Sequence, residues 1–166
     1  WCCLVGSEMC IRDSIESESL LRKGSNGIEF FTTQVLYDST KINKMLKYYN
    51  NICKQNDVFP RRILLSFAPV SSYKNIEFLK WLGVELSSHT EKRLLDKDSD
   101  MTEKSLEIAR EILNDILSNN EKNNIKVPIG LNVEHIMSYN FQHSINMLQE
   151  LSKIYRKFCI KTSLYD

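Results

Sequence analysis

Three polar side chains suited to binding chemistry lie near the ends of apolar segments. Gln34 closes the stretch IEFFTTQ, Ser66 interrupts the run ILLSFAPV, and Asn132 lies near the end of KVPIGLNV. A carboxamide or hydroxyl at such a position needs a hydrogen-bond partner, because buried polar groups are almost always paired. Gln34 offers a donor and an acceptor in one plane, so it can hold a polar ligand or hydrogen-bond within the protein.

Other patterns with chemical meaning are weak. The first apolar stretch leads into Tyr37–Thr40, with neither GxGxxG nor GxxxxGK[ST], which argues against a nucleotide site of the Rossmann or P-loop kind. Cys2, Cys3 and Cys10 lack the spacing of a zinc site, so no metal ligands are predicted.

The composition is that of a globular domain and excludes several classes of protein. The 166 residues include 22 Lys and Arg and 21 Asp and Glu. The resulting net charge of +1 gives no electrostatic case for nucleic-acid binding. The longest apolar run, Ile63–Val70, is far shorter than the ~20 residues of a membrane helix. Cys53 and Cys159 lie on apolar faces of helical patterns, so buried free thiols and a reducing, cytoplasmic compartment are expected.

Periodicity predicts the elements that position the polar residues. Strands are expected over Ile28–Tyr37, Ile63–Pro69 and Lys126–Val133, and helices over Glu16–Lys23, 42–53, 71–83, 102–119 and 140–158. The last helix is expected to bury one stripe: Phe141, Ile145, Leu148, Leu151, Tyr155 and Phe158. Strands that alternate with helices indicate βα units and a parallel sheet.

Two α/β architectures fit this order of elements: a doubly wound open sheet, or part of a (β/α)8 barrel. Polar residues at the carboxyl ends of apolar strands favour the barrel, where the chemistry lies on that rim. A complete barrel runs to ~250 residues. The prediction is therefore a partial (β/α)8 TIM barrel, with about three C-terminal βα units and parallel strands.

The ends of the chain are expected to lie outside this unit. Residues 1–14 contain VGSEMCIRDS, which resembles translated sequencing-adapter sequence. Residues 1–16 are therefore expected to be a non-native or disordered leader, 17–158 the barrel portion, and 159–166 a tail without a pattern.

The segment Leu20–Asp38, LLRKGSNGIEFFTTQVLYD, resembles the methylenetetrahydrofolate reductase family. The family pattern is a helix ending in Arg-Lys, a glycine-bearing turn, and a strand with Thr-Gln that leads to an Asp. LLSFAPV and FLKWLGV are similar to the family's following strand and helix, so the resemblance covers about Ser17–Phe158. It implies a fragment of a flavoprotein of one-carbon metabolism and methionine biosynthesis. Such an oxidoreductase converts 5,10-methylenetetrahydrofolate to 5-methyltetrahydrofolate with NAD(P)H via FAD.

The resemblance also implies roles for individual residues. Gln34 would contact the folate ring, and Phe67 would pack against the pterin or the aminobenzoate ring. Arg22 and Lys23 would reach the ADP part of FAD, and Ser19 would add a hydroxyl contact. Each role has a structural alternative: pairing within the barrel for the amide, core packing for the ring, and compensation of the helix dipole for the two bases.

The last strand departs from the family pattern. The family reads approximately T-L-N-R, and here Leu131 and Asn132 match while Val133 replaces the base. Asn132 is therefore predicted to bind substrate, and the folate tail lacks its usual cation. Glu134 and His135 are polar and lie at the rim, where a lone histidine is usually a surface residue.

No catalytic residue is predicted, because the family's general acid and its flavin-side aspartate lie on strands outside this chain. The chain alone is therefore expected to be inactive. Two other functions fit the same residues. One is a non-catalytic α/β domain that binds folate or a partner, and the other is a free-standing domain whose charged helices bind another protein. The sequence leaves open the choice between NADH and NADPH, and a homo-oligomer of the full-length protein.

Overall fold

The computed structural model describes residues 13–96 and 100–163. Its helices are α1 (Asp13–Ser25), α2 (Thr40–Gln55), α3 (Tyr73–Trp81), α4 (Ser88–Leu94), α5 (Met101–Lys122) and α6 (Phe141–Ser163), with a 3-10 turn η1 (Ser138–Asn140). Its strands are β1 (Phe30–Val35), β2 (Arg62–Phe67) and β3 (Ile129–Val133). Strands and helices thus alternate as the sequence predicts.

The strands form one parallel sheet in the order β1-β2-β3. Ile63 of β2 pairs with Phe31 of β1 on one side and with Ile129 of β3 on the other. The register of β1 shifts between Thr32 and Val35, which marks a β-bulge near its carboxyl end. The predicted parallel α/β sheet is confirmed, and closure into a barrel stays a prediction.

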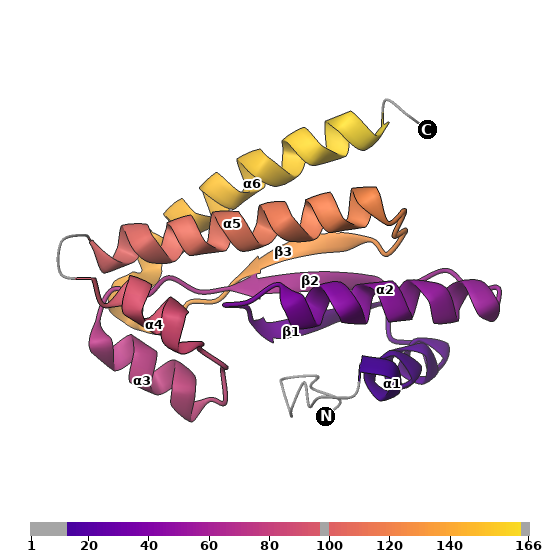
Figure 1. The fold of residues 1–166 in the computed structure, drawn as a ribbon, viewed down its shortest axis with the longest axis horizontal. Coiled ribbons are helices and arrows are strands. Elements are labelled where there is room, and N and C mark those ends of the chain that lie inside the picture. Colours follow the sequence, from indigo (N-terminus) through magenta and orange to yellow (C-terminus); the bar gives the residue numbers. More distant parts are fainter. Residues whose placement is uncertain (1–12, 97–99, 164–166) are drawn as a thin grey trace.

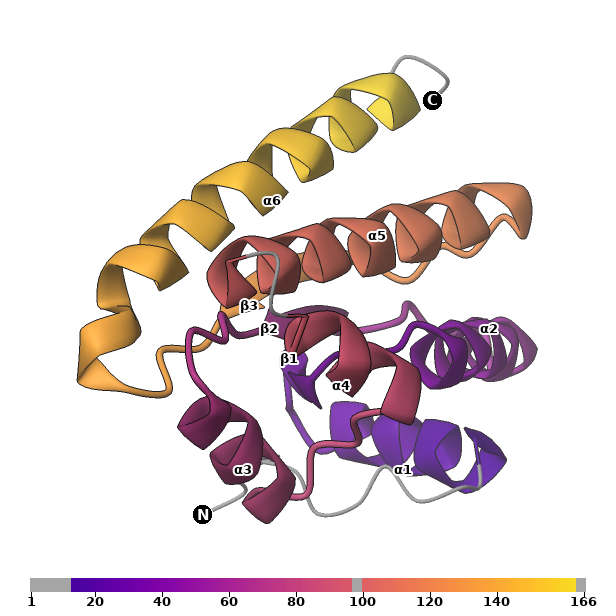
Figure 2. The ribbon, with the colours of Figure 1, turned by 60° about the vertical axis from the view of Figure 1, so that its left-hand side comes forward.

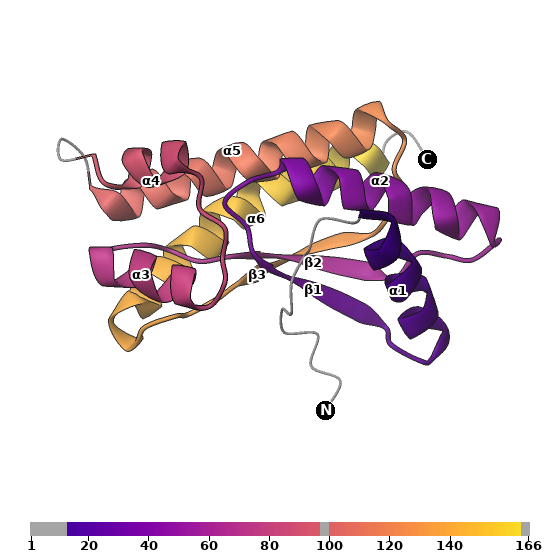
Figure 3. The ribbon, with the colours of Figure 1, turned by 60° about the horizontal axis from the view of Figure 1, so that its bottom comes forward.

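Helices pack in a layer on the sheet. Helices α2 and α5 lie over one face of it (Figures 1 and 3). Helix α1 packs against α2, while α6 packs against α5 and β3 (Figure 2). Helices α3 and α4 lie beyond the carboxyl ends of the strands, at the left of Figure 1. The segments after the strands are therefore held between helices on several sides.

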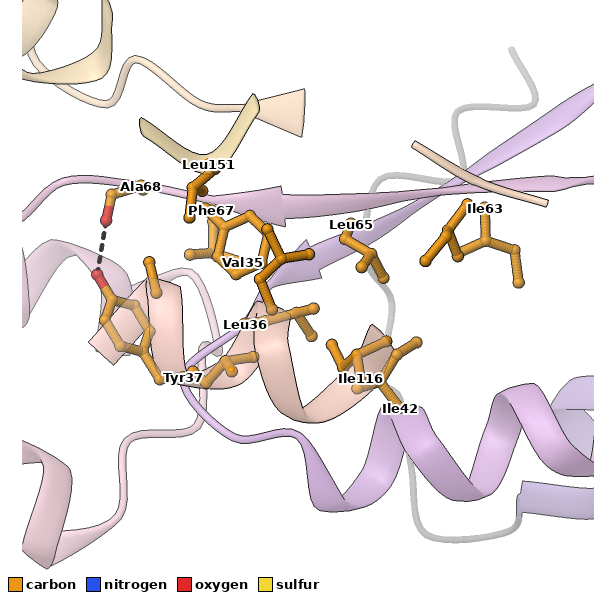
Figure 4. Close-up of a cluster of buried hydrophobic side chains, with 14 of the residues drawn as sticks. Val35, Leu36, Tyr37, Ile42, Ile63, Leu65, Phe67, Ala68, Ile116 and Leu151 are labelled. Atoms are coloured by element: carbon orange, nitrogen blue, oxygen red, sulfur yellow. Dashed lines mark hydrogen bonds between the residues drawn. The ribbon is translucent and has the colours of Figure 1, made fainter. Parts of the chain in front are cut away.

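The core lies between the sheet and these helices. Ile63 and Leu65 of β2 point toward Ile42 of α2 and Ile116 of α5, and all four are buried (Figure 4). Each such side chain contributes roughly 1.5–3 kcal/mol when it leaves water. Because side chains alternate along a strand, the residue after Leu65, Ser66, points to the opposite face of the sheet.

Helix α6 buries a different stripe from the predicted one. Phe141 and Leu148 are 58% and 43% exposed, whereas Ser144, Met147 and Leu151 are buried. The apolar stripe read from the sequence is therefore wrong at two of its positions. The reason is that the buried stripe is set by contact with α5 and β3, and not by the hydrophobicity of α6 alone.

Several boundaries also differ from the predictions. Helix α6 continues to Ser163, so the described part of the predicted tail is helical. Helix α1 begins at Asp13, inside the predicted leader, and residues 1–12, with their three cysteines, lie outside the described residues. Helix α4 lies in a polar stretch for which the sequence predicts no helix.

No described helix is long and apolar enough to cross a bilayer. Cys53 is buried, as predicted, whereas Cys159 is only half-buried. Cys53 is a free thiol.

Candidate functional site

The carboxyl ends of the three strands bring the predicted polar residues into one row. Ser66 pairs with Val35 of β1 and with Asn132 of β3, and Gln34 immediately precedes Val35. Neighbouring strands lie ~4.8 Å apart, so three adjacent strands place these groups within reach of one small ligand. We call Gln34, Ser66 and Asn132 the polar row.

Ser66 is the centre of the polar row and is fully buried. Its hydroxyl accepts a hydrogen bond from Nδ2 of Asn132 at 3.0 Å. Its backbone N–H donates to Oγ1 of Thr33 at 3.0 Å, where the bulge in β1 takes the main chain out of register. The row is therefore held by side chains as well as by the ladder, and Asn132 is fixed in orientation.

Glu134 joins the row two residues beyond Asn132. Its backbone N–H donates to the carbonyl of Phe67 at 2.7 Å, which extends the β2–β3 pairing past the end of β3. Two residues along a strand face the same side, so its side chain lies on the side of Asn132 and Ser66. Burial raises the pKa of the Glu134 carboxyl above its ordinary value, and a hydrogen bond from the Ser66 hydroxyl partly offsets that rise.

Gln34 is tied to helix α3. Its Nε2 donates to the carbonyl of Leu82, the C-cap residue of α3, at 2.8 Å. Gly83, next to it, adopts φ +82, a conformation that glycine reaches without strain. Among the described residues, no hydrogen bond to Oε1 of Gln34 is found, so this oxygen is available to accept one from a ligand.

A buried hydrogen-bond network holds the loops after β2 and β3 together. Oδ1 of Asn75 accepts from the Ser71 backbone N–H at 3.0 Å and from Nδ2 of Asn140 at 3.1 Å. Nδ2 of Asn75 donates to the Tyr139 hydroxyl at 2.9 Å. Asn75 and Asn140 are fully buried. Tyr139 and Asn140 lie 64 and 65 residues from Asn75 in the sequence, so the network joins α3 to η1.

The residues predicted to bind FAD lie elsewhere. Ser19, Arg22 and Lys23 belong to α1, and the two bases occupy its last turn. Helix α1 leads into the amino end of β1, so these residues lie toward the edge of the sheet opposite the polar row (Figure 1). Gln34 is the fifth residue of β1, so about 13 Å of strand separates it from the start of β1. The structure does not bring the two predicted sets together.

Phe67 lies on the core face of β2. Its side chain is 1% exposed and packs near Val35 and Leu151 (Figure 4). The alternative of core packing therefore describes its surroundings, and the predicted contact with a folate ring has no support in the geometry.

Among the described residues, two cavities lie outside the polar row. The larger, of about 680 Å³, lies between the ends of α5 and α6 at the amino edge of β3, and Asn120, Tyr155 and Phe158 help to line it. The smaller, of about 210 Å³, lies between the starts of the same helices and includes Pro69 and His143. In the described parts of the chain, no three His, Cys, Asp or Glu side chains gather as a metal site.

Comparisons with known proteins identify a fold relative. No protein-family model matches the chain, and no curated protein matches it. A solved structure of similar fold is that of an uncharacterized protein from Clostridium thermocellum that binds two copies of 5-methyl-5,6,7,8-tetrahydrofolic acid. The match has a TM-score of 0.70 at 23% sequence identity and covers 84% of this chain and 48% of that one. This chain therefore spans about half the length of that protein, and the two share a fold.

Proposed function

We propose that this chain is part of a domain that binds a reduced folate, with the pterin ring at the polar row. One observation carries the proposal: Gln34, Ser66 and Asn132 lie side by side at the carboxyl edge of a parallel sheet. Ligands of α/β folds bind at this edge, where loops vary while the strands hold fixed positions. The folate bound by the fold relative from Clostridium thermocellum supports the choice of ligand.

The chemistry of the row suits a pterin. A pterin is planar and presents several hydrogen-bond donors and acceptors around its pyrimidine ring. Oε1 of Gln34 accepts from such a donor while Nε2 stays bonded to Leu82. Asn132 uses Nδ2 on Ser66, which leaves its Oδ1 as a second acceptor. The held orientations lower the entropic cost of binding.

The test is a calorimetric titration of the purified chain with 5-methyltetrahydrofolate. We expect Gln34→Ala to weaken binding roughly 5-fold, because one hydrogen bond is worth about 1 kcal/mol. The matched control is Gln55→Ala at the exposed end of α2, which we expect to bind as the wild type does. A wild-type chain that binds no reduced folate, or equal affinities of the two variants, contradicts the proposal.

We further propose that the full-length protein reduces its folate with a flavin, and the sequence pattern over Leu20–Asp38 supports this activity. FAD would supply the hydride chemistry. The candidate contacts Arg22 and Lys23 lie at the other edge of the sheet from Gln34, so the described residues do not form one site for a diphosphate and a pterin. The test is the visible spectrum of the purified protein and its bleaching by NADH or NADPH. A colourless protein that takes up no added FAD argues for the non-catalytic folate-binding domain.

A further inference from the structure

Glu134 is a half-buried carboxyl at the edge of the sheet that takes part in no ion pair among the described residues. Its neighbours in the polar row are uncharged. Ser66 supplies a single hydroxyl proton, and Nδ2 of Asn132 donates one hydrogen bond to Ser66. One hydroxyl cannot satisfy a carboxylate, which has two oxygens and about four acceptor positions.

This arrangement is costly for the free protein. Glu134 is half-buried, so its carboxylate loses part of its hydration, and this partial burial raises its pKa. A ligand that brings two parallel N–H donors would satisfy both oxygens at once. Charge-assisted pairs of this kind are stronger and more directional than neutral hydrogen bonds.

We propose that Glu134 recognises the 2-aminopyrimidine edge of the pterin, with its carboxylate accepting hydrogen bonds from the ring N3–H and from the 2-amino group. This inference rests on the proposed folate-binding function and names the group that orients the ring. Ser66 positions the carboxylate from the protein side, and Asn132 positions Ser66.

The same geometry discriminates between ring systems. The matching edge of an isoalloxazine carries one N–H between two carbonyl oxygens, so a carboxylate there would face repulsion on both sides. A pterin offers two adjacent donors instead. Glu134 therefore favours a pterin over a flavin at the polar row, which is specificity by repulsion of the wrong ligand as well as by attraction of the right one.

The test pairs one substitution with one change in the ligand. Calorimetry on the full chain compares Glu134→Gln with wild type, using 5-methyltetrahydrofolate and its 2-desamino-2-methyl analogue. Glutamine keeps the shape of the side chain but turns a donor toward the ligand. We expect the substitution to weaken binding of 5-methyltetrahydrofolate roughly 10–100-fold, as for a lost charge-assisted contact. We expect the analogue to bind wild type with a similar loss, and to bind the variant with little further loss.

The controls separate this inference from the proposed function. Glu77→Gln removes an exposed carboxylate on α3 that is not part of the row, and we expect this variant to bind both ligands as wild type does. Circular dichroism melts verify that each variant is folded. If wild type binds 5-methyltetrahydrofolate and Glu134→Gln binds it equally well, this inference is overturned while the proposed function stands. If wild type binds no reduced folate, both fall together.

Discussion

Replacing Asn75 by alanine tests whether the buried network holds the edge of the sheet together. Four hydrogen bonds end on this side chain. It accepts from the Ser71 N–H at 3.0 Å, from the Ser71 hydroxyl at 3.1 Å and from Asn140 at 3.1 Å, and it donates to Tyr139 at 2.9 Å. Each is worth about 1 kcal/mol net, and partners left buried and unpaired cost more. We therefore expect Asn75→Ala to lower the free energy of unfolding by about 4 kcal/mol, a large part of the ~5–15 kcal/mol of a typical domain.

The assay is equilibrium unfolding in urea followed by far-UV circular dichroism. The matched control is Asn123→Ala at the exposed C-cap of α5, whose side chain donates to the carbonyl of Asn119 at 2.9 Å. The groups that Asn123 bonds are exposed and can form hydrogen bonds with water instead. We therefore expect Asn123→Ala to lower the free energy of unfolding by less than about 1 kcal/mol. Equal losses in the two variants would refute the reasoning, since burial would then make no difference to the value of these bonds.

Three further predictions use other parts of the fold. Tyr37→Phe removes the buried bond to the Ala68 carbonyl at 2.9 Å (Figure 4), so we expect a loss of about 1–2 kcal/mol in urea unfolding, and none for the exposed Tyr48→Phe. Because the pKa of Glu134 is raised by folding, wild type gains stability as the pH falls from neutral through that pKa toward its ordinary value. Glu134→Gln should therefore melt above wild type at pH 7, and thermal melts should show this advantage shrinking as the pH falls. Asp100→Ala removes the N-cap of α5, and we expect a loss of about 1 kcal/mol in urea unfolding, with a loss near zero contradicting the cap's role.

The fold class was accessible from the sequence because its signals are local. The apolar run ILLSFAPV and the amphipathic stretches on either side of it identify a buried strand between helices. From parallel strands it follows that Gln34, Ser66 and Asn132 share one edge, as the structure shows. Element bounds were less accessible, because Leu36 and Tyr37 continue the apolar pattern of β1 but lie beyond its last ladder position.

Other features depend on contacts between distant segments. Periodicity favoured Phe141 and Leu148 as core residues of α6, and only the positions of α5 and β3 turn Met147 inward instead. The pairing of Asn75 with Asn140 joins α3 to η1, which are far apart in the chain, and nothing in the local sequence signals it. Glu134 was noted only as a polar residue at the rim, because its burial depends on Ser66 of a different strand.

The bulge in β1 has a consequence for how the site can diverge. At that point the ladder is completed by Oγ1 of Thr33, which accepts the Ser66 N–H in place of a main-chain carbonyl. Valine has nearly the same shape as threonine but offers no oxygen. Thr33→Val would therefore leave the Ser66 N–H without its acceptor and weaken the pairing of β1 with β2 near their carboxyl ends. Among descendants of this sequence, position 33 is thus a place where a substitution can change the spacing between β1 and β2 while Gln34, Ser66 and Asn132 stay the same.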